Sequence, residues 1–438
     1  MRLNQAVSLG HTAVLLLPLL WGHAAAQSVS FSDTSDLSFF TGTRAKTSAA
    51  TGPPSSIYTT YNSKITLTGA TSASVTGSFT ERLSSTESSI STTTAGNVTV
   101  SSTTTSSSAA PTNTQPCNGY VELCTRKYSN ITAVGCHNSP FVRPGNTGSN
   151  QELPVKTQLD DGVRFLQAQI QFPVNGSVPH FCHTSCDLLD AGPINEWLSE
   201  VTEWVAAHPY DVVTILLGNG NYSHPSLYAP YIEQSGITTY AYQAPYLPMS
   251  YDDWPTLEYL IVRGKRVIMF LDYSADQNEY PWLLDEFSQV WETPFDPTDS
   301  SFPCTVQRPP DLSDDSARNR LYIMNHNLNA EFNVFSTQLL VPAVSLLNQT
   351  NNATGNGSLG MAANNCRSDW GRAPNVLNVD YYNYGDPPGS VFEVAAQMNN
   401  VTYDWNCCGQ VSAARVLRAA GAWVSLAPIL LCTYILWW

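Results

Sequence analysis

Three side chains able to exchange protons follow short apolar runs that we expect to be strands. His137 follows the run at residues 131–135, His183 follows residues 178–181, and Asp380 ends the last such run. Imidazole titrates near neutral pH, so a pair of histidines suits general acid–base catalysis, and a carboxylate can orient one ring and stabilise its cation. We therefore expect His137, His183 and Asp380 to form one catalytic group.

Other candidate residues have simpler interpretations. His326 also follows a predicted strand, but we expect it to be a hydrogen-bonded structural residue at the rim. His180 points to the other face of its strand, because side chains alternate along strands, and we expect no catalytic role for it. Tyr381 and Tyr382 could line a sugar pocket, although packing is the expected role of such aromatic residues.

Side chains that follow different strands meet only if those strands end at a common edge. Eight predicted strands with helices between them, over about 290 residues, predict an α/β fold of the (β/α)8 TIM-barrel type. In a closed barrel the first and last strands are neighbours, so Asp380 can reach His137. An open doubly wound sheet is the alternative, but no glycine-rich phosphate loop follows the first strand. The clearest helix is predicted at residues 193–207, and the strands at 131–135, 163–170, 178–181, 211–217, 237–242 (weaker), 266–271, 321–324 and 376–379.

The composition excludes some classes of partner. The chain has 438 residues, with 20 Lys and Arg against 35 Asp and Glu and a net charge of −15. Such a chain has no basic surface with which to neutralise nucleic-acid phosphates. Its 11 Trp, 21 Tyr and 15 Phe exclude disorder throughout the chain. We expect a monomer.

The two ends of the chain are predicted to be targeting signals. Residues 1–26 have a positive start, an apolar stretch too short to span a bilayer and an Ala-x-Ala cleavage site, which are typical of a signal peptide. Residues 409–438 combine small residues, a short spacer and a long uncharged tail, which predicts a glycosylphosphatidylinositol (GPI) attachment signal. A tail-anchored helix is the alternative, but no flanking cation follows the tail. The predicted location is the cell surface, at the plasma membrane or the cell wall.

The segment at residues 27–116 is predicted to be a disordered, glycosylated stalk. Between residues 84 and 114, 20 of 31 residues are Ser or Thr, a composition that cannot bury enough apolar surface to fold. A small β domain is the alternative for residues 27–83. Eight N-x-S/T sequons fit secretion, at Asn97, Asn130, Asn175, Asn221, Asn348, Asn352, Asn356 and Asn400.

All ten cysteines lie at or after Cys117, where the predicted folded domain of residues 117–408 begins. Cys432 lies in the tail that would be removed, and the remaining nine are an odd number. One thiol is therefore expected to be free or to pair between molecules. Cys182 and Cys186 are expected to form a local disulfide. Metal ligation by this pair with His183 is the alternative, but no second pair with suitable spacing exists.

Taken together, these residues resemble the X-domain barrel of phosphatidylinositol-specific phospholipase C, and most closely the secreted fungal phospholipase-C-like phosphodiesterases. The resemblance covers residues 117–408. It is carried by the His-Asn-Ser step at His137, the approach to the second strand at residues 159–166, His183, the strand entry at residues 209–217, and the Val-Asp-Tyr-Tyr motif at Asp380.

The resemblance implies a mechanism. His137 would take the proton of an inositol hydroxyl, which attacks phosphorus and gives a cyclic phosphate. His183 would protonate the leaving alcohol, and Asp380 would support His137. Asn138 matches a metal ligand of the calcium-dependent members, and Asp272 is a candidate for binding substrate hydroxyls.

The second strand departs from the family pattern. Gln167 and Gln169 stand where other members have acidic metal ligands or an arginine. The resemblance therefore gives no certain cofactor: calcium remains an option, but glutamine replaces its acidic ligands. These residues could still bind substrate through their amides. Loss of a stabilising charge would lower the rate, by ~10²–10³ for one donor.

The resemblance implies a phosphoric diester hydrolase that acts on an inositol phospholipid or a related glycolipid. A catalytically silent barrel, displayed on the cell wall for adhesion or wall organisation, is the alternative that the two glutamines favour. A third interpretation is a metal-dependent glycerophosphodiesterase, which would want a His-Arg step where this chain has His137 and Asn138.

Overall fold

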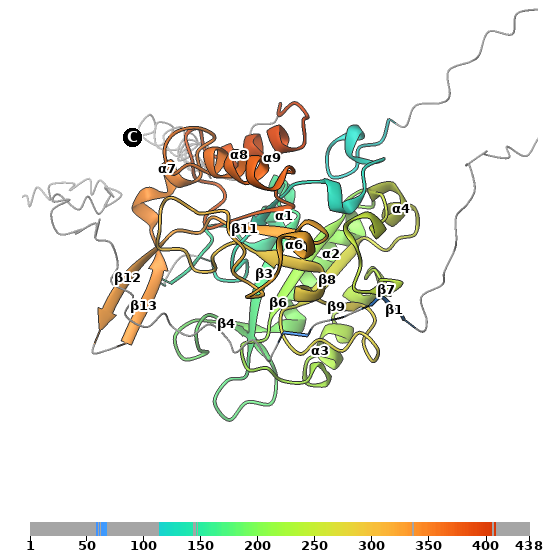
Figure 1. The fold of residues 1–438 in the computed structure, drawn as a ribbon. Helices are drawn as coiled ribbons and strands as arrows, with labels where there is room; N and C mark the ends of the chain where they lie inside the picture. The colour runs from blue at the N-terminus through green and yellow to red at the C-terminus, as the bar shows by residue number, and fades with distance from the viewer. Residues whose placement is uncertain are drawn as a thin grey trace, which may run out of the picture. The chain divides into compact units, whose positions relative to one another are not determined.

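The computed structural model describes residues 58–59, 61, 63–67, 114–142, 146, 148–334, 337–404 and 407–408. The central feature of these residues is a curled sheet of eight parallel strands, as expected for a barrel of the TIM type (Figure 1). The order along the sheet is β10-β11-β14-β2-β3-β6-β8-β9, so β9 and β10 are its edges. The strands are β2 (Ala133–Cys136), β3 (Phe165–Gln171), β6 (Val213–Gly218), β8 (Val267–Leu271), β9 (Leu283–Asp285), β10 (Val290–Glu292), β11 (Leu321–Asn325) and β14 (Val376–Val379).

Apolar residues on both faces explain why these segments form buried strands. All six residues of β6 and all five of β8 are buried. Alternate residues join two different apolar clusters, with Ile215 and Met269 in one and Leu216 and Phe270 in the other. The first cluster also contains the buried side chains of most helices, so it lies between the sheet and its helical cover. The second fills the inside of the barrel and also includes the helical residues Leu257 and Leu260.

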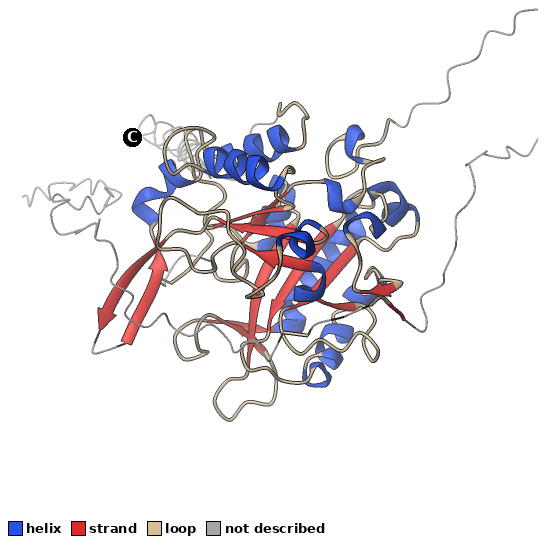
Figure 2. Cartoon of the chain, viewed as in Figure 1, coloured by secondary structure: helices blue, strands red, loops and turns tan. Residues whose placement is uncertain are grey.

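Helices occupy the connections between the strands (Figure 2). The predicted helix at 193–207 is α2. Six apolar residues at helical spacing are its buried residues: Ile194, Trp197, Leu198, Val201, Trp204 and Val205. Pro193 occupies the N-cap rather than the first turn, so α2 begins one residue later than expected. The helices are α1 (Val155–Asp161), α2 (Ile194–Ala207), α3 (Ala229–Gln234), α4 (Leu257–Val262), α5 (Glu286–Gln289), α6 (Asp314–Arg318), α7 (Leu347–Thr350), α8 (Leu359–Trp370) and α9 (Ser390–Met398).

Two predicted barrel strands are wrong. The segment at 178–181 contributes to β4 (His180–Cys182), which runs antiparallel to β3 and pairs with β5 (Asp190–Pro193) outside the eight-stranded path. The weaker candidate at 237–242 is a 3₁₀ helix, Ile237–Thr239, followed by a single bridge. The places of both in the barrel are taken by β9 and β10, which are only three residues long.

Part of the predicted stalk folds onto the barrel. In β1 (Ile65–Thr66), the chain pairs antiparallel with β7 (Tyr246–Leu247), and the Tyr58 ring packs against Phe287 at 4.9 Å between centroids. A disordered stalk throughout 27–116 is therefore wrong for this piece, since its apolar residues find partners. The signal peptide, the Ser/Thr-rich residues 84–113 and the C-terminal tail lie outside the described residues. Within the described part, no helix is long and apolar enough to cross a membrane. A hairpin of β12 (Asn329–Val334) and β13 (Thr337–Pro342) follows β11.

The cysteines of the described residues pair as far as their number allows. The predicted disulfide between Cys182 and Cys186 is present. Cys136, on β2, is the free thiol among the described residues and is completely buried. This agrees with the odd cysteine count expected after loss of Cys432. The other disulfides are Cys117–Cys124, Cys304–Cys366 and Cys407–Cys408.

Candidate active site

A layer of polar side chains lies inside the barrel. It is nearer the C-terminal ends of the strands than the apolar cluster that fills the interior. Because side chains alternate along a strand, the residue two positions after a barrel-interior residue also faces the interior. Phe165 is followed in this way by Gln167, Val376 by Asn378, and Phe270 by Asp272. In the same way Val290 is followed by Glu292, Ile323 by Asn325, and Asn378 by Asp380, which complete the polar layer.

The predicted contact between His137 and Asp380 is present in this layer. Parallel pairing of β14 with β2 brings the strand ends together, and His137 Nδ1 lies 2.8 Å from Asp380 Oδ1. Asn150 Nδ2 donates to the same carboxylate oxygen at 2.9 Å. Gln151 Nε2 donates to the carbonyls of His137 and Val379, which ties the two strand ends together. The imidazole is thereby held in one orientation.

The environment of His137 favours its protonated form. Its 3% exposure means that burial alone would lower the pKa. The charge of Asp380 and its hydrogen bond outweigh burial, so the pKa of His137 is raised above its ordinary value. The contact with Asp380 therefore favours the protonated form of this ring.

His183 lies beside His137 for a reason that the pattern of apolar runs does not reveal. It follows the antiparallel strand β4, not the end of a barrel strand. Gln171 Nε2 donates to the carbonyls of Cys182 and Thr184 and fixes this turn to β3. Burial first, and then the positive charge of His137, lower the pKa of His183 to about 4. The two rings are therefore close enough to interact electrostatically, and their pKa values are shifted in opposite directions.

A chain of hydrogen bonds fixes the direction of the Gln167 amide. Asn325 Nδ2 donates to Glu292 Oε2 at 3.0 Å. Asn378 Nδ2 donates both to Asn325 Oδ1 at 3.0 Å and to Gln167 Oε1 at 2.9 Å. Because a carboxylate only accepts hydrogen bonds, Glu292 sets the direction of each amide along the chain. Among the described residues, Gln167 Nε2 has no partner and is left as a donor.

Arg308 is a buried cation that the sequence analysis missed. It lies in the loop after β10, where its guanidinium is 3.3 Å from Glu292 and 3.5 Å from Asp272. It also donates to the Tyr273 hydroxyl at 2.8 Å, and its Nε has no partner among the described residues. Loop residues carry no periodic signal, so only the buried carboxylates around it could have pointed to it.

Two further predicted substrate-binding residues have other contacts. Asp272 Oδ1 accepts the backbone N–H of Asn219 at 2.6 Å, and burial raises the Asp272 pKa to about 6 against the opposing effect of Arg308. Gln169 is half-buried, and its carboxamide lies so close to Gly218 that a side chain there would collide with it. Asp272 therefore faces the buried cation, while Gln169 lies against the neighbouring strand β6.

The amides at the family's metal positions do not fit a calcium site. Calcium prefers several oxygen ligands that include carboxylates. Asn138 Oδ1 is buried without a partner among the described residues and could serve as one ligand. Gln167 Oε1 is already accepting from Asn378, and Gln167, Gln169 and Asn138 bring no negative charge.

The residues given simpler interpretations behave as expected. His326 Nε2 donates to the carbonyl of Thr350, and the ring stacks on Phe302 at 3.6 Å. Tyr381 and Tyr382 are fully buried and hydrogen-bond within the protein. His180 pairs with the carboxylate of Asp190 on β5.

Comparison with known proteins identifies the family of the chain. The profile of the PI-PLC X 1 family matches residues 123–399. An uncharacterised secreted protein of Arthroderma benhamiae is 47% identical over 402 residues, which cover 91% of this chain and 90% of the relative. The PI-PLC X domain-containing protein 1 of the same organism is 43% identical over 272 residues, covering 62% and 86%. The solved phosphatidylinositol-specific phospholipase C of Listeria monocytogenes matches with a TM-score of 0.40 and 13% identity, covering 64% of this chain and 96% of that structure. The chain belongs to the PI-PLC X family.

Proposed function

We propose that the protein cleaves a phosphodiester of an inositol phospholipid or related glycolipid. An inositol hydroxyl gives its proton to His137 and attacks phosphorus, forming a cyclic phosphate. The bond from phosphorus to the leaving alcohol breaks, and His183 gives that alcohol a proton. Asp380 and Asn150 hold the His137 ring in place throughout.

The observation that carries this proposal is the buried contact of His137 with Asp380, next to a second histidine of opposite pKa shift. The opposite shifts favour a proton on His137 over one on His183, and an acid–base pair needs one proton between its two rings. An anionic phosphodiester beside His183 favours its protonated form, and transfer of the proton leaves His137 neutral and able to act as the base.

Two groups could stabilise the negative charge on the phosphate in place of the metal ion or arginine of other family members. Gln167 Nε2 is oriented by the Glu292 chain as a hydrogen-bond donor, which can stabilise negative charge on a phosphate oxygen. Arg308 supplies a positive charge close to His137. Burial raises the pKa of the Asp296 carboxyl, and the charges of His137 and Arg308 both oppose this rise, so both cations lie near the same carboxyl. Neither group needs a bound ion.

Exposed apolar side chains in the loops that follow the strands near the candidate active site support a lipid substrate. Val174 and Leu188, which are 74% and 59% exposed, lie in loops after β3 and β4. Tyr222 and Leu227 are also exposed and lie in the loop after β6. Apolar side chains on loops at one edge of a barrel can enter the interfacial layer of a membrane.

The test is turnover of phosphatidylinositol in vesicles by the full secreted chain, compared with His137→Ala and His183→Ala. We expect both variants to lose activity. The assay is repeated after enzymatic deglycosylation, because exposed sequon asparagines Asn175 and Asn221 lie in the same rim loops and glycans there would shield the apolar side chains. Equal turnover by wild type and both variants would refute the proposed mechanism.

The silent barrel is the second candidate. It is favoured by Arg308, whose charge is already balanced by Glu292 and Asp272. In that case the wild-type chain has no turnover with any inositol phosphodiester, in either glycosylation state.

A further inference from the structure

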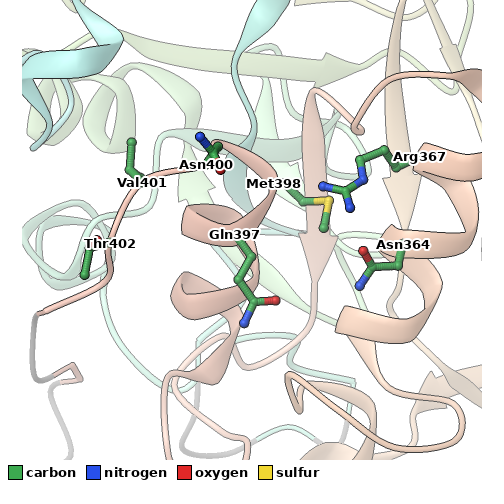
Figure 3. A pocket seen from close by; sticks show the side chains of 7 residues that line it. All are labelled: Asn364, Arg367, Gln397, Met398, Asn400, Val401 and Thr402. Atoms are coloured by element: carbon green, nitrogen blue, oxygen red, sulfur yellow. The ribbon is translucent and has the colours of Figure 1, made fainter.

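A hollow of about 400 Å³ lies between α8 and the turn after α9 (Figure 3). The hollow and the proposed catalytic residues lie toward opposite ends of β2. Asn399, at the end of α9, accepts a hydrogen bond from the backbone N–H of Thr132, which directly precedes β2. His137 follows the other end of that strand. The lining residues are Asn364, Arg367, Gln397, Met398, Asn400, Val401 and Thr402.

Three of the lining residues form one glycosylation sequon, Asn400-Val401-Thr402. The backbone of Asn400 adopts a left-handed conformation, with φ 51°, and two hydrogen bonds back to α9 hold the turn. Asparagine is common in that conformation after a helix, so the turn alone explains Asn400. The turn does not explain Thr402, which is exposed and has no hydrogen bond to any described residue.

The chemistry of the hollow matches a sugar. Arg367 and Asn364 lie on one side and Gln397 on the other, with Met398 between them (Figure 3). Arg367 makes no ion pair or hydrogen bond with another described residue, so its N–H groups are free to donate to hydroxyls. Met398 and Val401 offer an apolar surface to the C–H face of a sugar ring. The volume lies within the roughly 300–1,000 Å³ of small-ligand sites.

We propose that the first sugars of an N-linked glycan on Asn400 occupy this hollow and are held there by Arg367 and its neighbours. The acceptor nitrogen belongs to an exposed residue at the edge of the hollow, so the glycan needs no movement of the backbone to enter it. Such a glycan would cover the end of α9 on the side of the barrel away from the active site.

The experiment uses the full chain secreted from a host that attaches N-glycans. Glycopeptide mass spectrometry measures occupancy at Asn400 and at Asn130, an exposed sequon residue outside the hollow. The folded protein is then treated with an endoglycosidase, and the release of each glycan is followed in time. Arg367→Ala is compared with Arg263→Ala, which removes an exposed arginine on α4's C-terminal side.

We expect Asn400 to be occupied and its glycan to be released roughly tenfold more slowly than that of Asn130, the factor that about 1.4 kcal/mol supplies. Arg367→Ala should remove most of the difference, whereas Arg263→Ala should not. The proposal is overturned by an unmodified Asn400, by equal release rates in the wild type, or by protection that survives Arg367→Ala unchanged. Thermal unfolding of each variant identifies any change caused by lost stability.

Discussion

Replacing Gln167 by leucine tests whether its amide stabilises the reacting phosphate. Leucine has a similar size but can neither donate nor accept a hydrogen bond. In the structure the change removes the acceptor of one Asn378 Nδ2 hydrogen bond and the free Nε2 donor, and the rest of the chain from Asn378 to Glu292 keeps its partners.

The two losses have different sizes and appear in different measurements. Loss of a donor that stabilises the transition state costs about 10²–10³ in kcat. An unsatisfied hydrogen on the buried Asn378 amide costs about 1–3 kcal/mol of unfolding free energy. For a domain of this size each kcal/mol lowers Tm by roughly 2–4 °C. We therefore expect a large loss of kcat together with a moderate loss of Tm.

The assay measures kcat and KM on phosphatidylinositol vesicles, with Tm measured on the same samples. Glu292→Gln is the companion variant, because an amide there can either donate or accept and no longer fixes the direction of the Gln167 amide. It should show an intermediate loss, and the double variant should be no slower than Gln167→Leu alone. A Gln167→Leu enzyme with wild-type kcat and a lowered Tm would show that Gln167 is only structural.

The remaining predictions concern protonation, metal and membrane contact. The plot of kcat/KM against pH should be bell-shaped, with an acid limb near pH 4 from His183 and an alkaline limb above pH 6.5 from His137. Asp380→Asn should move the alkaline limb to lower pH, since the carboxylate charge raises the His137 pKa. Chelators should leave turnover unchanged. An activity that requires calcium would contradict the inference that the amides of Asn138, Gln167 and Gln169 do not form a calcium site. Burial lowers the pKa of His326 to about 3, so only the unfolded chain takes up this proton as pH falls from 6.5. The unfolding free energy should therefore drop by up to about 1.4 kcal/mol per pH unit from this group, and His326→Gln should weaken that dependence in denaturant titrations at pH 4 and 7. Val174→Asp should reduce vesicle binding and turnover in vesicles while leaving hydrolysis of a soluble short-chain substrate intact; equal loss on both substrates would contradict the membrane role.

The contact of His137 with Asp380 could be predicted because it depends only on regular features. Both residues follow strands whose apolar runs are easy to recognise, and the barrel makes the first and last strands neighbours. The strand alternation that starts at Phe165 also places Gln167 inside the barrel. The interior face of these strands and the pairing of the first strand with the last were therefore accessible from local patterns.

Features fixed by irregular segments were not accessible in this way. β9 and β10 have three residues each and no periodic signal, so residues 178–181 and 237–242 were assigned to the barrel in their place. Arg308 comes from a loop, and its burial depends on carboxylates from two separate strands. The direction of the Gln167 amide depends on Glu292, which is three hydrogen bonds away and 125 residues later in the sequence.

The buried Cys136 thiol gives the protein an internal reporter of local opening. It lies on β2 immediately before His137, and burial first, then nearby carboxylates, raise its pKa well above the ordinary value. A thiol reagent can react with it only when β2 separates from its neighbours, since the thiolate is the reactive form and the side chain is inaccessible. The rate of labelling under native conditions therefore measures how often the strand that precedes the proposed catalytic base comes apart. A substrate analogue that bridges the two histidines should slow this labelling in proportion to its occupancy.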